Sequence, residues 1–499
     1  MAIGAISNIY LLIFLPLIAS LCCHILTGKN LAFWWTIFTS LLLLFLSLKI
    51  FPSIWNFEKI TNDFQLSILS IALEFRLDLL GIIFLLLLLF IKTVTLFFFH
   101  DDVEKLLNDK DKRIFYAVFL LNLFAIIGIL TANNLFNLFC FFEIYAFSFL
   151  ALTSISFDLK LLKISFRYFC LSSLSSLIII FSFFAIYLTF GEVNFDRIAE
   201  NFYLLPKQEL WFIELLLALV AFAVILRFFP FWLYFKKLRS SSLLASYMIS
   251  DALFNKSLLG IFLTLKFTYF FFGSQLVFAK FDFDLLLLLT AISLIFYSSI
   301  KLYSQKHLKL ICLYFSLNNL GFILASMALQ SIQSLQALFF YLLNFSLVNF
   351  FIFIFATFLK NHFHSSSLIK VWLVRHNSLA LVLPFKMLMF FIAALPLSFM
   401  FFANWYLAYS SFALGFEAFI LAGLLVSNFV YVIIVIKLID SFFSFHASSE
   451  MPILDIKNYR FYLAAFWFLI TVIYLGLLAS GPLNQLSLRF ASFLLSNSI

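Results

Sequence analysis

Charged residues are scarce in this chain. Only 11% of its 499 residues are Asp, Glu, Lys or Arg, 65% are hydrophobic, and the mean hydropathy is +1.12. A soluble domain carries about 25% charged residues and about half apolar ones. The composition therefore excludes a soluble globular fold and predicts a protein that lies in a lipid bilayer.

Sites for metals and redox cofactors are also lacking. The five cysteines fall within or at the ends of apolar segments, and no two have the two-residue spacing of a zinc or iron–sulfur site. No histidine falls at the membrane depth that a haem ligand needs, and no glycine-rich nucleotide motif occurs. We therefore expect the chain to bind no cofactor itself. The cysteines expected to pack as small apolar side chains are Cys22, Cys23, Cys140, Cys170 and Cys312.

Apolar segments long enough to cross a membrane recur along the whole chain. A helix needs about 20 apolar residues to cross about 30 Å of hydrocarbon, where no backbone group can be left unpaired. About fourteen segments meet this length, which predicts an all-α polytopic membrane protein. The predicted spans are residues 9–27, 31–51, 77–99, 113–132, 134–156, 164–190, 210–229, 246–271, 283–303, 309–328, 335–359, 379–410, 415–439 and 461–480. Between the second and third spans, FQLSILSIALEF (64–75) predicts a short strand pair at the membrane surface.

Lysine and arginine are unevenly divided between the two sides of these spans. Positive residues accumulate in inner loops because they are retained on the side from which the spans insert. When the chain is taken to start on the outer face, most loop Lys and Arg fall on the inner side. The pattern therefore predicts that both termini face outwards. It also accounts for the net charge of +9, so no nucleic-acid partner is expected.

Three charged residues in the first half lie inside or near predicted spans. A charge at the bilayer centre costs several kcal/mol, so such a residue is a functional candidate that is expected to be paired in the protein interior. Glu143 and Lys256 lie well inside their spans, and Arg227 lies three residues before Pro230, which interrupts its helix. Titratable groups on neighbouring helices form a line that can pass protons. We therefore predict a proton-translocating line of Glu143, Arg227 and Lys256.

Two other charged residues have both a functional and a structural interpretation. Lys92 and Glu417 stand towards the interior of apolar segments. Asp251 precedes Lys256 by five residues, at the start of the span, and is expected at the membrane interface.

The second half repeats the theme of the first with fewer charges. Pro396 interrupts a long span as Pro230 does, and two broken segments in corresponding positions are typical of inverted-repeat transporters. Lys386 precedes this break. Amide side chains inside the spans can join helices or hold water, so we predict a polar relay. Its members are Asn319, Asn349 and Asn404.

Three stretches resemble a known family. They are FRYFCLSSLSSLIIIFSFFAIYLTFGEVNFDRIA (166–199), LYFSLNNLGFILASMA (313–328) and LQALFFYLLNFSLVNFFIF (335–353). They are similar to patterns of the antiporter-like subunits of respiratory complex I, which are related to subunits of multisubunit Na⁺/H⁺ antiporters. The resemblance runs from about Leu77 to Lys437 and is greatest to the subunit-2 branch of the mitochondrial enzyme. The spacing from Pro230 to Lys256 also fits the subunit-4 branch.

The resemblance implies a domain plan. It implies one antiporter-like membrane domain over 1–499, with two inverted five-helix repeats and with helices 7 and 12 broken. The implied parts are N-terminal helices 1–3 (1–112), a first repeat of helices 4–8 (113–272), a second repeat of helices 9–13 (283–440) and a C-terminal helix 14 (461–499).

The resemblance also implies roles for individual residues. Glu143 matches the family's glutamate of the fifth span and Lys256 its lysine of the eighth, while Arg227 stands near the place of the seventh-span lysine. Asn319 stands where the family has His, and Asn404 where the broken twelfth span has Lys or Glu. The second half-channel therefore lacks its usual titrating groups unless Lys386 substitutes for them.

The function implied is that of a proton-translocating core subunit of NADH:ubiquinone oxidoreductase. NADH, FMN, iron–sulfur clusters and ubiquinone would be bound by other subunits. The expected partners are other membrane-arm subunits, including a neighbouring antiporter-like one, and phospholipids such as cardiolipin. The 76 phenylalanines suggest an AT-rich organelle genome and hence the mitochondrial inner membrane, with both termini in the intermembrane space. A free-standing Na⁺/H⁺ antiporter and a purely structural scaffold are the competing hypotheses.

Overall fold

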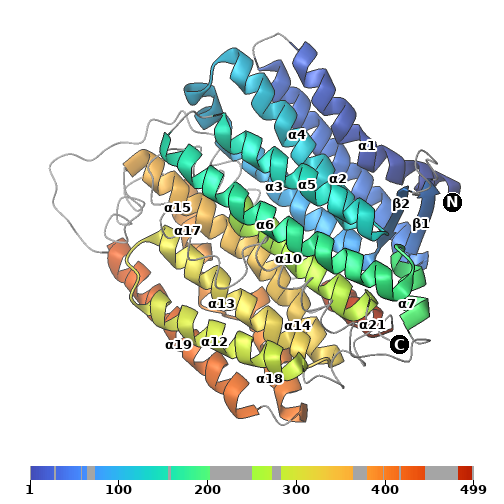
Figure 1. The fold of residues 1–499 in the computed structure, drawn as a ribbon. Helices are drawn as coiled ribbons and strands as arrows, with labels where there is room; N and C mark the ends of the chain where they lie inside the picture. Colours follow the sequence, from blue (N-terminus) through green and yellow to red (C-terminus); the bar gives the residue numbers. More distant parts are fainter. Residues whose placement is uncertain are drawn as a thin grey trace. The chain divides into compact units, whose positions relative to one another are not determined.

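The fold is taken from a computed structural model and consists almost entirely of long helices (Figure 1). The residues that the structure describes are 2–26, 30–57, 59–64, 73–155, 159–202, 250–271, 283–363, 379–396, 398–414, 417–443 and 481–496. The chain divides into two compact units, Met1–Gly273 and Ser274–Ile499.

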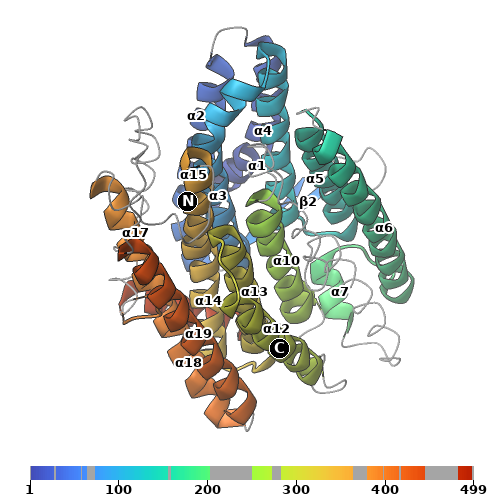
Figure 2. The ribbon, with the colours of Figure 1, turned by 90° about the vertical axis from the view of Figure 1, so that its left-hand side faces the viewer.

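The first unit is a group of helices with one small β-hairpin. Its elements are α1 (Ala2–Ile25), α2 (Leu31–Phe57), β1 (Lys59–Phe64), β2 (Leu73–Asp78), α3 (Leu79–Leu106), α4 (Asp109–Thr131), α5 (Leu135–Ser154), α6 (Leu159–Phe190), α7 (Phe195–Phe202), the π-helix η2 (Asp251–Asn255), α10 (Lys256–Leu265) and the π-helix η3 (Lys266–Phe271). Helix α4 packs on α1 and α5, and α3 packs on α2. Helix α6 packs against α5, and α7 follows at its end (Figure 2).

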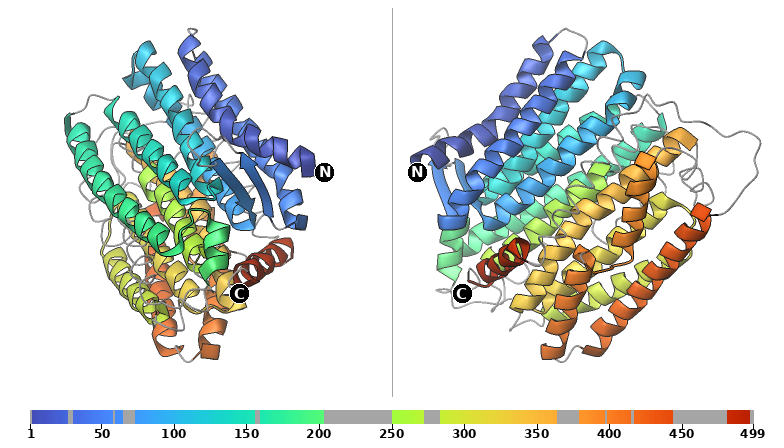
Figure 3. Two further views of the ribbon diagram at one scale, coloured as in Figure 1. Left: turned by 45° about the vertical axis from the view of Figure 1, so that its right-hand side comes forward. Right: turned by 180° about the vertical axis from the view of Figure 1, so that it is seen from behind.

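The predicted strand pair is present, but it is displaced along the chain. Strands β1 and β2 are antiparallel, with Lys59 opposite Asp78 and Phe64 opposite Leu73. The hairpin lies beside the N-terminal part of α1 (Figure 3). Strand β1 begins at Lys59, five residues before the predicted stretch 64–75, and residues 65–72 of that stretch lie outside the described part of the chain.

The second unit is built around two buried helical segments. Its elements are α12 (Phe283–Tyr303), α13 (Leu308–Ala328), α14 (Ile332–Leu343), the π-helix η4 (Asn344–Asn349), α15 (Phe350–Phe363), α17 (Leu379–Ile392), α18 (Phe399–Leu414), α19 (Glu417–Phe443) and α21 (Pro482–Ser496). Helix α13 and the continuous run α14–η4–α15 are almost wholly buried. Helix α12 packs on α13, while α18 and α21 pack on α14 (Figure 3).

The chain is an all-α polytopic membrane protein, as its composition predicts. Within the described residues, nine helices are long and apolar enough to cross a bilayer. The spans predicted at 210–229 and 461–480, and with them Arg227 and Pro230, lie outside those residues, so the total of fourteen and the repeats stay predictions. The predicted break is present, because α17 ends at Ile392 and α18 begins at Phe399, with Pro396 between them. Helix α21 follows the predicted span 461–480 and lies within the part assigned to the C-terminal helix (461–499).

Close packing of α4 on α5 depends on a glycine. A Cβ atom added to Gly128 would lie 2.1 Å from the ring of Phe141, far inside van der Waals contact. Phe141 is buried, and its ring packs on Phe124 and Phe75 at centroid distances of 5.3 and 6.2 Å. The ring therefore has little room to move, and Gly128 sets how closely the two helices approach.

We expect Gly128→Ala to destabilise the protein by about 1–3 kcal/mol, because the methyl group overpacks this interface. The measurement is the thermal unfolding midpoint of the detergent-solubilised protein. Gly423→Ala is the control, since the nearest atom to its added Cβ is the Cγ2 methyl of Ile295 at 3.3 Å. Equal midpoints for the two variants would contradict the packing argument.

Candidate functional site

A buried ion pair lies at the centre of the first unit. The ammonium of Lys92, on α3, is 2.5 Å from the Oδ1 atom of Asp251, on η2, and the two side chains are 0% and 1% exposed. Both charges are therefore removed from solvent. Such a pair is stable only when further hydrogen bonds satisfy its remaining donors and acceptors.

Neighbouring polar groups supply those hydrogen bonds. Lys92 Nζ also donates to Asn122 Oδ1 at 2.6 Å, and the Asn122 amide donates to Ser148 Oγ at 2.8 Å. Asp251 accepts from Asn255 Nδ2 at 2.7 Å and from the Tyr145 hydroxyl at 3.3 Å. The cluster thus joins α3, α4, α5 and η2 in one network, which we call the Lys92–Asp251 network.

Lys256 lies next to this network. Its side chain is buried, and its Nζ atom is 3.7 Å from the centre of the Phe149 ring and 5.4 Å from that of Tyr145. Ring faces attract a cation when water is excluded. Lys92, Asp251 and Lys256 therefore place three ionisable side chains in one buried region.

The local backbone brings these groups together. Residues 251–255 form a single turn of π-helix directly before the α-helix that begins at Lys256. Such π-bulges occur mostly within α-helices and often at functional sites. In this turn Asn255 hydrogen-bonds to Asp251, and Lys256 follows at once. The expectation that Asp251 lies at the membrane interface is wrong, because the turn carries its carboxylate into the buried pair.

Glu143 faces away from the network. Tyr145 and Ser148 follow it by two and five positions, so at about 100° per residue they point about 200° and 140° away around α5. Glu143 instead shares a face with Phe136 and Phe147, which are 45% and 54% exposed among the described residues. Its own side chain is half-buried, and no basic side chain of the described residues forms an ion pair with it. Arg227, its predicted neighbour in the proton line, lies outside those residues.

The predicted relay residues of the second unit have different surroundings. Asn319 on α13 and Asn349 on η4 are buried, and no described group hydrogen-bonds to either side-chain amide. Asn404 on α18 is half-buried, accepts from the Tyr341 hydroxyl at 2.7 Å and donates to Asn428 Oδ1 at 3.1 Å. Lys386 on α17 is exposed among the described residues.

A second buried cluster, centred on Asn318, lacks charge altogether. The amide of Asn318 donates to Ser298 and Ser299, both at 2.9 Å, and its Oδ1 atom accepts from the Tyr431 hydroxyl at 2.5 Å. These groups join α12, α13 and α19. The sequence places Asn318 inside a span but does not indicate its partners.

We expect Asp251→Leu to destabilise the protein by about 3–5 kcal/mol, because it leaves the Lys92 ammonium buried without its carboxylate. Adding Lys92→Met should recover most of this loss, since apolar replacement of a whole buried pair is often neutral. The unfolding midpoints of both single variants and the double variant test this. A double variant as unstable as the sum of the singles would contradict the pairing.

Similar proteins share this fold. The chain matches the family model described as NADH:quinone oxidoreductase/Mrp antiporter, transmembrane, over residues 132–430. No protein with curated annotation shows significant similarity to it.

Three solved structures illustrate the likeness in fold. A chain of the Mrp complex from Dietzia sp. has 16% sequence identity and a TM-score of 0.81, covering 98% of this chain and 97% of that one. A chain of the membrane-bound sulfane sulfur reductase, an archaeal respiratory membrane complex, has 18% identity and a TM-score of 0.83 over 98% and 99%. A chain of respiratory complex I from Thermus thermophilus has 16% identity and a TM-score of 0.74 over 97% and 99%.

The family match includes the connection before α5, Glu143 and Lys256, and it ends within α19. It covers more than half of the chain. This chain therefore belongs to the NADH:quinone oxidoreductase/Mrp antiporter transmembrane family.

Proposed function

We propose that the chain is a proton-translocating membrane-arm subunit of mitochondrial NADH:ubiquinone oxidoreductase, from the subunit-2 branch. The observation that carries the proposal is the buried Lys256 beside the Lys92–Asp251 network. Ionisable groups are costly inside a membrane protein, and three of them in one buried cluster are what a proton pathway requires. Family membership adds the expectation of proton or cation translocation.

The cluster suggests how charge movement is coupled. With Lys256 protonated, its ammonium lies in the same buried region as the Lys92–Asp251 pair. Release of a proton from Lys256 removes one positive charge from beside that pair. A charge that approaches or leaves the cluster from outside therefore changes the free energy of protonating Lys256, because buried charges interact strongly.

Glu143 and Arg227 are the proposed entry members of the line, as the family resemblance implies. In the second half, Asn319, Asn349 and Asn404 are the proposed relay. The amides of Asn319 and Asn349 are buried without a described protein partner, which favours water there. Lys386 is the titratable candidate for this half.

The same proposal implies which subunits bind the cofactors, which partners this chain has and in which membrane it lies. Electron transfer would take place in other subunits that bind NADH, FMN, iron–sulfur clusters and ubiquinone, and this chain would bind none of them. Its partners would be membrane-arm subunits, among them a neighbouring antiporter-like one, together with cardiolipin. It would lie in the mitochondrial inner membrane with both termini in the intermembrane space. Subunit 4 of the same enzyme is the alternative assignment within the complex.

A cation/proton antiporter is the second candidate function. The fold similarity to a chain of the Mrp complex favours it, with a TM-score of 0.81 over nearly the full length of both chains. In that case the same buried lysines would exchange protons against Na⁺ without electron transfer.

We expect this chain to migrate with NADH dehydrogenase activity when native membranes are solubilised gently and their complexes are separated by size. A subunit of that complex should stay bound to the subunits that oxidise NADH when the detergent is mild. Migration in a small species without that activity would overturn the proposal and favour a free-standing antiporter or a scaffold.

We expect Glu143→Gln to lower the number of protons translocated per electron more than it lowers assembly, because the amide keeps the shape of the side chain but cannot carry a proton. The ratio is measured in native vesicles from proton uptake and NADH oxidation. Lys110→Gln, at an exposed position on α4, is the control. A normal ratio in assembled Glu143→Gln vesicles would remove Glu143 from the pathway.

A further inference from the structure

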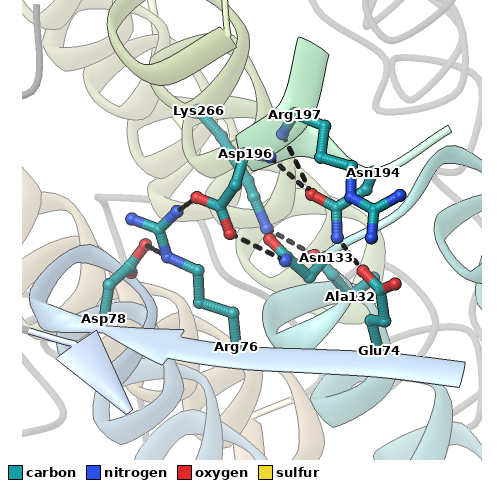
Figure 4. Close-up of polar contacts among 9 residues, drawn as sticks. All are labelled: Glu74, Arg76, Asp78, Ala132, Asn133, Asn194, Asp196, Arg197 and Lys266. Carbon is teal, nitrogen blue, oxygen red and sulfur yellow. Dashed lines mark hydrogen bonds and ion pairs between the residues drawn. The ribbon is translucent and has the colours of Figure 1, made fainter. Parts of the chain in front are cut away.

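A second group of charged residues lies at one end of the first unit, where three chain connections meet (Figure 4). The connections are the end of β2, the link between α4 and α5, and the link between α6 and α7. Backbone hydrogen bonds hold them together, from Asn133 N to Glu74 O at 3.1 Å and from Phe195 N to Asn133 O at 3.0 Å. Helix α3 begins here. So does η3, which starts at Lys266, directly after the helix α10 that Lys256 begins.

Two aspartates and an arginine form the charged part of this group. The Arg76 guanidinium pairs with Asp196, and its Nε atom lies 3.7 Å from Asp78 Oδ2. Asp196 also accepts from the Asn133 amide at 3.0 Å. The side chains of Arg76 and Asp78 are 10% and 8% exposed, whereas that of Asp196 is 33% exposed. Asp196 is therefore where this group meets the surroundings.

Lys266 is the buried cation of the group. Only 6% of the residue is exposed, and its Nζ atom donates to the backbone oxygen of Ala132 at 2.6 Å. The rings of Phe195 and Phe262 lie 5.1 and 5.5 Å from Nζ. Within the described chain Lys266 forms no ion pair. An ammonium has three donors, and burial without a paired carboxylate is costly unless the other donors find acceptors.

A small cavity of about 30 Å³ lies between Lys266 and the acidic groups. Its polar lining consists of Lys266, Arg76, Asp78, Asn133 and Asp196. Two buried atoms of that lining, Asn133 Oδ1 and Arg76 Nε, have no hydrogen-bond partner among the described residues. A cavity of this size holds a water molecule when two to four polar partners surround it. The lining therefore fits bound water that touches both Lys266 and the carboxylates.

The cavity lies at the opposite end of helix α10 from Lys256. Lys256 begins α10, and Lys266 follows immediately after its last residue, ten positions later. At 1.5 Å per residue the two lysines are about 15 Å apart along the helix. The helical segment from Lys256 to Lys266 thus has one lysine beside the buried network and a second beside the cavity.

We propose that this cavity is a proton-exchange site between the membrane interior and the aqueous face, with Lys266 as its proton-carrying residue and Asp196 as its outer acceptor. The inference rests on the proposed function. It adds the place in the first unit where protons enter or leave the chain. The ion pair of Arg76 with Asp196 holds the site closed between transfers.

The transfer balances in protons and needs no oxidant. An N–H bond of the Lys266 ammonium breaks, and a bound water molecule takes the proton. The same water molecule gives one of its own protons to the Asp196 carboxylate. Lys266 becomes a neutral amine and Asp196 a neutral acid. Arg76 then keeps Asp78 as its counter-charge. The charged groups that face Lys266 are Asp78 and Arg76 from β2 and Asp196 from α7.

The experiment compares Lys266→Arg with Lys266→His in native vesicles. Arginine keeps the positive charge and the donors but hardly deprotonates, so the proton-to-electron ratio should fall by the same fraction as in Glu143→Gln. Histidine titrates near pH 6.5 in water. The ratio of Lys266→His should therefore rise towards wild type as the pH falls through the pKa of the imidazole in this cavity, and fall to the arginine level above that pKa.

A control and a second readout separate this role from a structural one. Arg197→Gln is the matched control, since Arg197 is exposed, pairs with Glu192 at 3.6 Å and does not line the cavity. An assembled Lys266→Arg enzyme with a normal ratio would overturn the inference. If that variant fails to assemble, a Lys266→His ratio that does not change with pH would overturn it. Normal translocation by Glu143→Gln would instead count against the proposed function.

Discussion

The buried pair of Lys92 and Asp251 is the interaction on which the first unit depends. Two charges are held away from water, and the loss of hydration is offset only when both find all their partners. The network joins four elements, since Lys92 lies on α3, Asn122 on α4, Tyr145 and Ser148 on α5, and Asp251 on η2. The π-helical turn that presents Asp251 also begins the helix of Lys256. One constraint therefore fixes both the packing and the place of the candidate proton carrier.

In the second unit, the described polar side chains of the buried cluster are neutral amides and hydroxyls. Asn318 is satisfied by serine and tyrosine hydroxyls, whereas Asn319 and Asn349 have no described partner for their amides. Neutral hydrogen bonds cost less to bury than charges, so this unit needs no compensating ion pair. Among the described residues, the buried cluster of the first unit therefore contains charged side chains, whereas that of the second contains amides and hydroxyls.

Composition and spacing predicted much of this arrangement because they report local properties. The long apolar runs, the burial of Lys256 and the break at Pro396 each follow from a short stretch of sequence. The pairing of Lys92 with Asp251 could not be predicted, because the two residues lie on elements far apart in the chain and nothing local says which helices touch. That Glu143 points away from the network could not be predicted either, because it depends on how α5 is rotated against its neighbours. The position of β1 was missed because its polar sequence, KITNDF, lacks the apolar alternation of a buried strand.

The measurement that tests the central claim most directly is the proton-to-electron ratio of an assembled Lys256→Met enzyme in native vesicles. Methionine keeps the length and apolar stem of the side chain, so it should pack against Phe149 while carrying no proton. The account predicts that the enzyme assembles and that proton translocation falls relative to wild type. An undiminished ratio would contradict the claim that the buried lysine beside the Lys92–Asp251 network carries protons.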